Sequence, residues 1–342
     1  MVCGSLYLRK LVRDSESVAV YLKAERCAKG VPEAIQAKLE GIAKDTEFLK
    51  HLIYAGALDI CIDGLNEVSP DTRAKVSEFA ESNFKGNIIM ATQPIEWEPP
   101  SIAKTYILKP LRDDQIEAFL ISREQTFSQD AKVKGQAYQQ ACKDYLATAL
   151  CQTQCGEETE IARRMLSNPM DLSIVGQMIG HGQSPNVFRL YEQQFRMMSA
   201  KYEREHLRAF PIAAFSERVY QQRLSDNTEV PYQDFAKEAE CLEDFKMALR
   251  RQSQNKETWH FRHDKIMEYF IALTFENNEN RLIDNISDPR FRGVYFMLAT
   301  LMPDDAAMSL REELIQYAAR TKDHTVSDTF VQLMRSRKQG NP

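Results

Sequence analysis

The spacing of apolar residues along the chain changes near residue 110. Before that point, short runs of β-branched and other apolar residues alternate with segments whose apolar residues recur every three or four positions. This alternation predicts parallel strands joined by helices, with the strands buried on both faces. The predicted strands are residues 17–22, 58–63, 87–92 and 105–108.

Helix signals lie between these strands. Asp45 can cap a helix with an apolar stripe, and residues 32–42 form another helix candidate. Ser69-Pro70-Asp71 marks a third helix start, because it combines a capping side chain, a proline at the first helical position and an acid in the first turn. The alternation of strand and helix therefore continues through the first hundred residues.

From Asp113 onward the apolar period becomes 3.6 residues, which predicts an almost entirely helical region. An alternating stretch, residues 258–263, predicts a short strand, after which Asp264 can cap the next helix. Helices combined with a small strand suit a winged-helix domain, and the residues after 280 are typical of helical pairs. The expected helices are residues 113–126, 132–151, 157–166, 170–179, 187–202, 210–224, 232–238, 240–251 and 265–276.

Residues 58–68 carry the clearest chemical signal. An apolar run ends in Asp63, and Glu67 follows four residues later. An aspartate at the carboxyl end of a buried parallel strand lies where open α/β sheets bind their ligands. One carboxylate can hold a hydrated Mg²⁺, and the next can polarise a water aimed at a phosphate. A buried strand followed by a polar turn would explain the same residues.

Composition narrows the class of protein. The 342 residues suggest two or three domains, and the formal net charge of −5 does not call for a nucleic-acid partner. Seven scattered cysteines, an odd number, favour a reducing cytoplasm over a disulfide framework. We find no apolar run near the ~18 residues that span a bilayer and no signal-peptide pattern, so we expect a cytoplasmic protein without a membrane segment.

Three segments of the first part of the chain, in this order, resemble a known family. Residues 60–68 are similar to the Walker B segment of NACHT ATPases, a clade of the STAND signalling NTPases. Residues 88–94 fall where that family has its sensor strand. Residues 106–111, followed by residues 114–116, resemble its exit into a helical lid. The order and spacing of the segments make the resemblance more specific than any one of them.

Two segments of the helical half extend the resemblance, which covers roughly residues 4–275. Residues 166–172 look like the lid-helix motif, whose proline, here Pro169, packs near the adenine in the family. Residues 261–270 look like the winged-helix segment, whose histidine, here His263, reaches the diphosphate in the closed, resting state.

The resemblance implies a site for ATP or ADP with Mg²⁺. Asp63 would bind the metal, and Glu67 would be the catalytic residue that positions water. Ser5 would supply the metal-binding hydroxyl, beside Gly4 in the tail of the phosphate-binding loop. Gln93 stands at the end of the sensor strand, where the family commonly has arginine.

The chain departs from the family in its phosphate-binding loop. No G-x-x-x-x-G-K-[ST] string occurs, Gly4 stands where the lysine should be, and Asn66 replaces a usual second aspartate. The strand that precedes the loop is also missing. We therefore expect a fragment that begins inside the loop or a degenerate copy, with NTPase activity only if the loop is supplied upstream.

The expected architecture is an α/β parallel-sheet P-loop NTPase core, truncated at its N-terminus, followed by mostly α-helical lid, winged-helix and C-terminal regions. The predicted domains are residues 1–109, 110–182, 183–276 and 277–342. The implied function is a nucleotide-dependent switch in which exchange of ADP for ATP permits self-association or binding of protein partners.

Two other functions remain open at the level of the sequence. The first is a non-enzymatic helical interaction scaffold that keeps the fold and no longer binds nucleotide, which the absent lysine, Asn66 and Gln93 favour. The second is a nucleic-acid adaptor that uses the winged helix. The acidic net charge argues against the adaptor.

Overall fold

The computed structural model describes residues 17–39, 41–82, 85–92, 97–127, 131–150, 157–253, 256–276 and 278–339. The chain divides into two compact units, Met1–Leu108 and Lys109–Pro342. The buried apolar residues that are described form two separate hydrophobic cores, one in each unit. The finer division of the second unit into lid, winged-helix and C-terminal domains stays a prediction.

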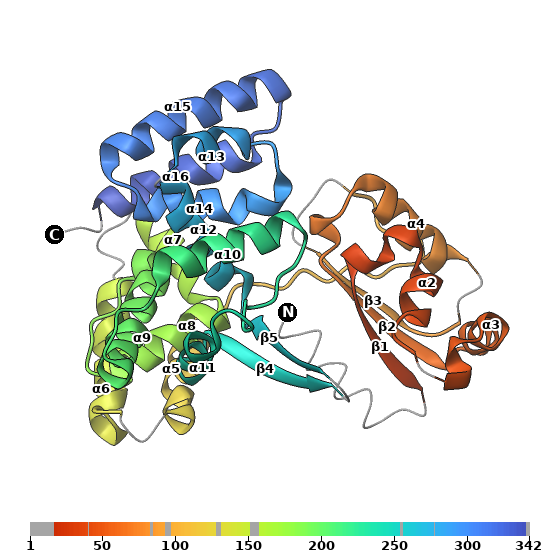
Figure 1. The fold of residues 1–342 in the computed structure, drawn as a ribbon, viewed down its shortest axis with the longest axis horizontal. Helices are drawn as coiled ribbons and strands as arrows, with labels where there is room; N and C mark the ends of the chain where they lie inside the picture. Colours follow the sequence, from red (N-terminus) through yellow and green to blue (C-terminus); the bar gives the residue numbers. More distant parts are fainter. Residues whose placement is uncertain are drawn as a thin grey trace. The chain divides into compact units, whose positions relative to one another are not determined.

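The first unit is built on three parallel strands that lie side by side (Figure 1). They are β1 (Val18–Lys23), β2 (Leu58–Asp63) and β3 (Ile88–Ala91), with β2 in the centre. The strand predictions for these three segments are confirmed. All of β2 except its last residue is buried, as its apolar run requires, whereas the four residues of β3 are only half-buried. The expectation that β3 is a buried strand is therefore wrong.

Two side chains predicted as helix caps have that role. The Asp45 carboxylate accepts a hydrogen bond from the backbone N–H of Phe48 at 2.9 Å, and the Ser69 hydroxyl accepts one from Thr72 N–H at 3.3 Å. Both bonds satisfy amides that the first turn of a helix leaves without partners. The helical segments of this unit are η1 (Ala24–Lys29), α2 (Val31–Gln36), η2 (Gly41–Lys44), α3 (Thr46–Ala55), η3 (Leu65–Glu67) and α4 (Pro70–Glu81).

The predicted fourth strand, residues 105–108, is absent. The segment has no regular structure, and Tyr106, Ile107 and Leu108 are 82%, 85% and 78% exposed. A strand needs a neighbour for its backbone groups, and in the described part of the chain no strand lies beside this segment. Its β-forming side chains are therefore insufficient to make it a strand.

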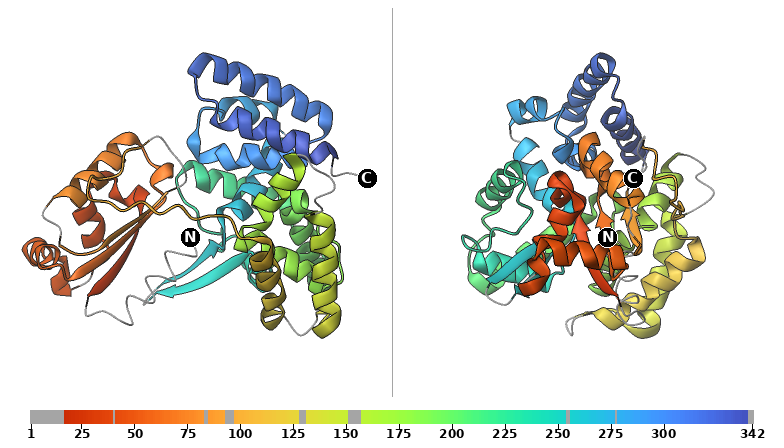
Figure 2. Two further views of the ribbon diagram at one scale, coloured as in Figure 1. Left: turned by 180° about the vertical axis from the view of Figure 1, so that it is seen from behind. Right: turned by 90° about the vertical axis from the view of Figure 1, so that its right-hand side faces the viewer.

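The second unit is helical except for one β-hairpin. Its helices α13 to α16 gather at one end, and α5 and α6 lie at the other (Figures 1 and 2). The elements are α5 (Asp113–Ser122), η4 (Arg123–Thr126), α6 (Gly135–Ala149), α7 (Glu157–Leu166), α8 (Pro169–Gly180), η5 (Val187–Arg189), α9 (Leu190–His206), α10 (Ile212–Leu224), α11 (Ala236–Asp244), β4 (Ala248–Ser253), β5 (Lys256–Phe261), α12 (Asp264–Glu276), α13 (Glu279–Asp284), η6 (Pro289–Phe291), α14 (Arg292–Leu301), α15 (Asp304–Thr321) and α16 (Thr325–Gln339).

The helices predicted at residues 232–238 and 240–251 are wrong. One helix, α11, occupies the middle of this stretch, and the residues from Ala248 onward form β4, which pairs antiparallel with β5. Lys246, at φ 59°, turns the chain between the end of α11 and the start of β4. The residues from Ala248 onward are extended because they pair with β5 in a hairpin, and the helical spacing of their apolar residues does not indicate that pairing.

One hydrophobic core runs through the second unit from α5 to α16. Its centre holds closely packed aromatic rings, such as Phe215 and Phe270, whose centroids lie 4.8 Å apart, and Phe195 and Phe210 at 5.3 Å. Because α8, α9 and α12 all contribute to this core, their first turns are held by shared packing. None of the helices in the described part of the chain has the length and apolarity that crossing a membrane requires.

Candidate functional site

The expected metal ligand Asp63 lies at the end of the central strand. Its register partners are Lys23 on β1 and Ala91 on β3, so the three strands end at one level. The Tyr21 hydroxyl donates a hydrogen bond to Asp63 Oδ2 at 2.7 Å. The half-buried carboxylate is thus oriented at the edge of the sheet where parallel α/β folds bind ligands.

The turn that carries Glu67 is held in a defined shape. Gly64 has φ 86°, a left-handed conformation that suits glycine, and it lets the chain turn directly after the strand. From α4, the Arg73 guanidinium donates to the backbone oxygens of Leu65 at 3.3 Å and Val68 at 2.7 Å. The backbone of Glu67 is therefore fixed by contacts on both sides, while its side chain lies outside the described atoms.

Asp59, at the other end of β2, was not singled out by sequence reasoning. It is 3% exposed and accepts hydrogen bonds from the Ser17 hydroxyl, from Asn87 Nδ2 at 2.8 Å and from Asn87 N–H at 3.3 Å. Burial acts to raise the pKa of Asp59, but these hydrogen bonds outweigh it and hold the pKa below its ordinary value. Asp59 joins the starts of the three strands and has a structural role.

Three of the predicted nucleotide-binding residues cannot be located. Gly4, Ser5 and Gln93 lie outside the described residues. Among the residues that are described, no three or more histidine, cysteine, aspartate or glutamate side chains come together as a metal site. Of the predicted metal ligands, the described Asp63 fits the expected Mg²⁺, since a carboxylate at the end of a sheet strand is a ligand that Mg²⁺ accepts with its waters.

Pro169 occupies the first position of α8, one residue before the predicted start of this helix at residue 170. The preceding Asn168 accepts a hydrogen bond from Met170 N–H at 2.9 Å and so caps the helix. Asp171, in the same first turn, is completely buried. An acid in this position favours the helix, because the helix N-terminus carries a partial positive charge.

His263 lies directly before α12 and caps it. Its Nδ1 accepts the backbone N–H of Lys265 at 3.1 Å, so the neutral ring carries its proton on Nε2. Burial and the charge of Lys265 lower the pKa of His263, while Asp264 and Asp171 act to raise it, and the net shift is downward. The prediction that Asp264 caps this helix is wrong, because Asp264 is its first residue and His263 makes the capping bond.

The lid-helix motif and the winged-helix motif are joined by an ion pair. Lys265 Nζ lies 2.8 Å from Asp171 Oδ2, and the Tyr191 hydroxyl donates to Asp171 Oδ1 at 2.5 Å. Pro169 and His263 are thus each two residues from one contact between α8 and α12, in which Asp171 is buried and Lys265 is partly exposed. Sequence reasoning missed this pair, although a lysine in the first turn of a helix opposes the helix dipole and signals an acidic partner.

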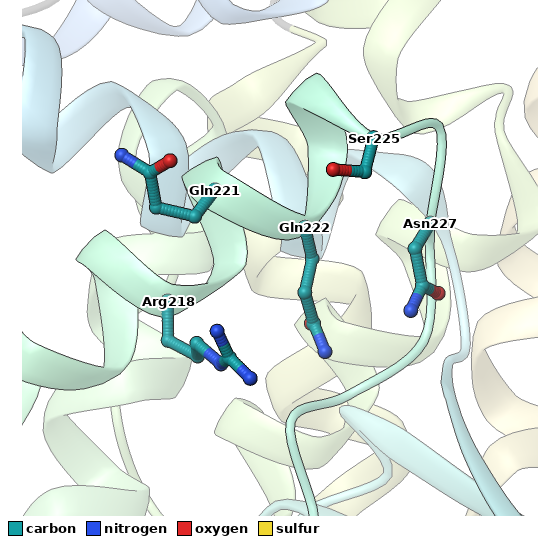
Figure 3. Close-up of a pocket in the computed structure, with 5 residues that line it drawn as sticks. All are labelled: Arg218, Gln221, Gln222, Ser225 and Asn227. Atoms are coloured by element: carbon teal, nitrogen blue, oxygen red, sulfur yellow. The ribbon is translucent and has the colours of Figure 1, made fainter.

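A polar cavity lies elsewhere in the described residues. It has a volume of about 400 Å³ and lies at the C-terminal end of α10 (Figure 3). The Arg218 guanidinium is paired with Asp234 at 3.0 Å, and the C-terminus of a helix carries partial negative charge, so the cavity does not suit a phosphate. None of the predicted site residues lines it; the lining residues are Arg218, Gln221, Gln222, Ser225 and Asn227.

Comparison with known proteins does not identify a family. No protein-family model matches the chain, and no curated protein matches it. The NACHT resemblance accordingly stays a prediction that rests on the sequence motifs.

Proposed function

We propose that this protein is a nucleotide-dependent switch of the NACHT type, with a P-loop NTPase core in its first unit and a helical lid and winged helix in its second. The observation that carries the proposal is the Asp171–Lys265 ion pair, because it joins two motifs 94 residues apart that the resemblance assigns to one nucleotide. The distance between these motifs in the sequence makes their meeting an independent support for the proposal.

The first turns of α8 and α12 suit an anionic ligand. Each contributes the partial positive charge of a helix N-terminus, and the neutral His263 has an Nε2–H group that can donate a hydrogen bond. Lys265 adds a full positive charge, part of which Asp171 neutralises. In this proposal, His263 binds the diphosphate of ADP, and Pro169 packs near the adenine.

The first unit supplies the groups that act on ATP. Asp63, oriented by Tyr21, would hold Mg²⁺ through its water shell, and the metal would neutralise charge on the phosphates when bound. The turn held by Arg73 would present Glu67 to orient the attacking water. Hydrolysis would be slow, would reset the switch, and would require an intact phosphate-binding loop.

The switch depends on a difference in affinity between two states. ADP would stabilise a closed state through Pro169 and His263, and ATP would favour an open state that associates with itself or with protein partners in the cytoplasm. A nucleotide can shift this equilibrium only by as much as its affinities for the two states differ.

Titration with fluorescent ADP and ATP analogues tests the proposal. The full chain should bind both in the presence of Mg²⁺, and Asp63→Asn, which can still accept the Tyr21 hydrogen bond, should weaken ATP binding about tenfold or more. Asp71→Asn, an exposed acid on the neighbouring α4, is the matched control and should bind as the wild type does. No binding at millimolar nucleotide, or equal binding by Asp63→Asn, would refute the switch.

A non-enzymatic interaction scaffold is the second candidate. It is favoured by the absence of any G-x-x-x-x-G-K-[ST] string and by Gly4 at the lysine position. A folded chain that does not bind nucleotide at millimolar concentration, yet forms stable complexes with itself or a protein, would support this function.

A further inference from the structure

Lys265 makes two contacts, one with the residue that caps its own helix, α12, and one with a side chain of α8. Its backbone N–H donates to Nδ1 of His263 at 3.1 Å, and its side-chain ammonium reaches Asp171 on α8 at 2.8 Å. Whatever fixes Lys265 in place therefore also fixes the imidazole ring of His263.

Asp171 is an unusual partner because it is fully enclosed. Its side chain is 0% exposed, and each carboxylate oxygen has a donor, Tyr191 on one and Lys265 on the other. Burial and the neighbouring Asp171 raise the pKa of Tyr191 well above its ordinary value, so Tyr191 remains a hydrogen-bond donor. Three helices, α8, α9 and α12, thus meet at one carboxylate.

The ion pair lies at the boundary between core and solvent. The Lys265 side chain is 33% exposed, so water can reach it, while Asp171 is sealed. If Lys265 left, Asp171 would remain as a buried charge with one neutral donor, which a protein tolerates poorly. We therefore expect the first turns of α8 and α12 to stay joined while the ion pair is intact and to separate when it breaks.

We propose that Asp171 and Lys265 are positioning residues that form a latch, which holds the first turn of α12 on α8 and thereby keeps His263 in place. When the ion pair breaks, His263 is released and the first turn of α12 parts from α8. The importance of this latch for ADP rests on the proposed function, whereas the latch itself does not.

The chain contains a matched cluster that lacks this linkage. Glu238 is 3% exposed and accepts hydrogen bonds from the Tyr202 hydroxyl and from Arg208 at 2.7 Å. It combines a buried acid, a tyrosine of α9 and a base, as the latch does, but its members all lie within the predicted winged-helix domain. Glu238→Gln therefore removes a buried charge without touching the latch.

The test measures the pKa of His263 by NMR of ¹³C-labelled histidine in the full chain. The protein has six histidines, so His263→Asn identifies the signal. Two variants, Asp171→Asn and Lys265→Met, break the pair. If the pair holds His263 in place, both variants release the ring into water and raise its pKa toward the ordinary value of about 6.5, and the double variant gives no further rise.

A purely electrostatic influence predicts a different pattern. The charged groups that act on His263 are Asp264 and Lys265 on its own side and Asp171 from α8. Without a positioning role, loss of the negative Asp171 would lower the pKa of His263, and loss of the positive Lys265 would raise it. The pKa shift in the double variant would then be the sum of these two opposite shifts. A lower pKa in Asp171→Asn would overturn the latch.

Two controls make the result specific. Glu238→Gln should leave the pKa of His263 unchanged, and an equal rise there would also overturn the latch, since any buried charge would then suffice. Lys265→Arg should restore the wild-type value, because it can still reach Asp171. If Asp171→Asn alone does not fold, the double variant, which leaves no buried charge, is compared with Lys265→Met. An equal pKa of His263 in the two supports the latch, and a lower pKa in the double variant, as the loss of Asp171 by electrostatics alone predicts, overturns it.

Titration with fluorescent ADP on the same variants separates this inference from the proposed function. If both hold, Asp171→Asn and Lys265→Met bind ADP about tenfold more weakly, and Glu238→Gln binds normally. A wild type that binds no nucleotide but shows the expected pKa pattern would refute the proposed function and support the latch. A wild type that binds ADP but lacks the pKa pattern would refute the latch alone.

Discussion

Three buried carboxylates, Asp59, Asp171 and Glu238, show how single residues stabilise this protein. Each is at most 3% exposed, and each accepts hydrogen bonds from at least two side chains. An ionised carboxylate is costly to bury without such donors, so the donors are as important as the acid. Asp59 offers the simplest test, because its partners are the neutral side chains of Ser17 and Asn87.

Asp59→Asn should destabilise the first unit by about 1–3 kcal/mol at pH 7, since it replaces a charged acceptor with an amide that cannot accept every bond. The lowered pKa of Asp59 means that its contribution is complete above about pH 4 and is lost as the pH falls through the lower folded value. Urea unfolding at pH 7 and pH 3 should show the difference between variant and wild type shrinking in acid.

The exposed Asp71 provides the comparison for this experiment. Its ion pair with Lys75 lies at the surface, so Asp71→Asn should change stability by less than about 1 kcal/mol. A larger effect of Asp71→Asn than of Asp59→Asn would contradict the structural role of Asp59.

Leu207 adopts a conformation that suits glycine. It ends α9 at φ 53° and ψ 30°, and it is 91% exposed. A left-handed conformation costs a non-glycine residue about 1–2 kcal/mol. Leu207→Gly should therefore stabilise the second unit by about 0.5–1 kcal/mol after the extra chain entropy of glycine is subtracted. Leu207→Ala keeps the unfavourable φ and should remain within about 0.5 kcal/mol of wild type in the same denaturant titration.

At the scale of elements, α12 depends on the charge state of the residue before it. A neutral His263 caps the helix through Nδ1, whereas a protonated ring loses that acceptor and places a positive charge at the positive end of the helix dipole. Because burial and Lys265 lower the pKa of His263, its stabilising effect is present above about pH 6.5 and is lost as the pH falls through the lower folded value.

Two substitutions of His263 separate capping from titration. His263→Asn keeps a capping side chain that does not titrate, so it should match wild type at pH 7.5 and become the more stable of the two near pH 5. His263→Ala should lower the free energy of unfolding by about 1 kcal/mol at pH 7.5. Because neither alanine nor asparagine titrates, His263→Ala should be less stable than His263→Asn by the same amount at pH 7.5 and at pH 5. Chemical denaturation of the second unit measures both effects, and a wild type that gains stability over His263→Asn in acid would contradict the assignment.

Elements with complete local signals were predicted well from the sequence. The helix starts at Asp45 and at Ser69 and the central strand up to Asp63 carry their caps or apolar runs within a few residues. Prediction failed where pairing with another strand decides the structure. Residues 248–253 became a strand because β5 pairs with them, and residues 105–108 did not because in the described residues no strand pairs with them.

In the candidate site, too, the contacts between separate segments are what the sequence does not predict. Its individual groups, Asp63, Glu67, Pro169 and His263, are predicted from motifs. The position of Asp63 at the end of β2 follows from the local apolar run, whereas the sequence predicts α8 only from residue 170 and places His263 in a strand rather than at the cap of α12. The ion pair that joins two of these motifs could not be predicted, because nothing in a single sequence places Asp171 beside a lysine 94 residues away.

At the scale of the whole molecule, the separate cores of the two units predict two unfolding steps. One core is built around β1 and β2, and the other runs from α5 to α16. Cooperative unfolding follows shared packing, so each core is expected to melt as its own unit. Calorimetry of the full chain should therefore show two transitions.

A matched pair of leucine substitutions assigns these transitions. Leu22 on β1 and Leu298 on α14 are both 0% exposed, one in each core. Leucine to alanine in a packed core costs about 2–5 kcal/mol, a large part of the stability of one unit. Leu22→Ala should lower the melting temperature of one transition only, and Leu298→Ala that of the other only. A single transition lowered by both variants would show that the two cores unfold as one cooperative unit.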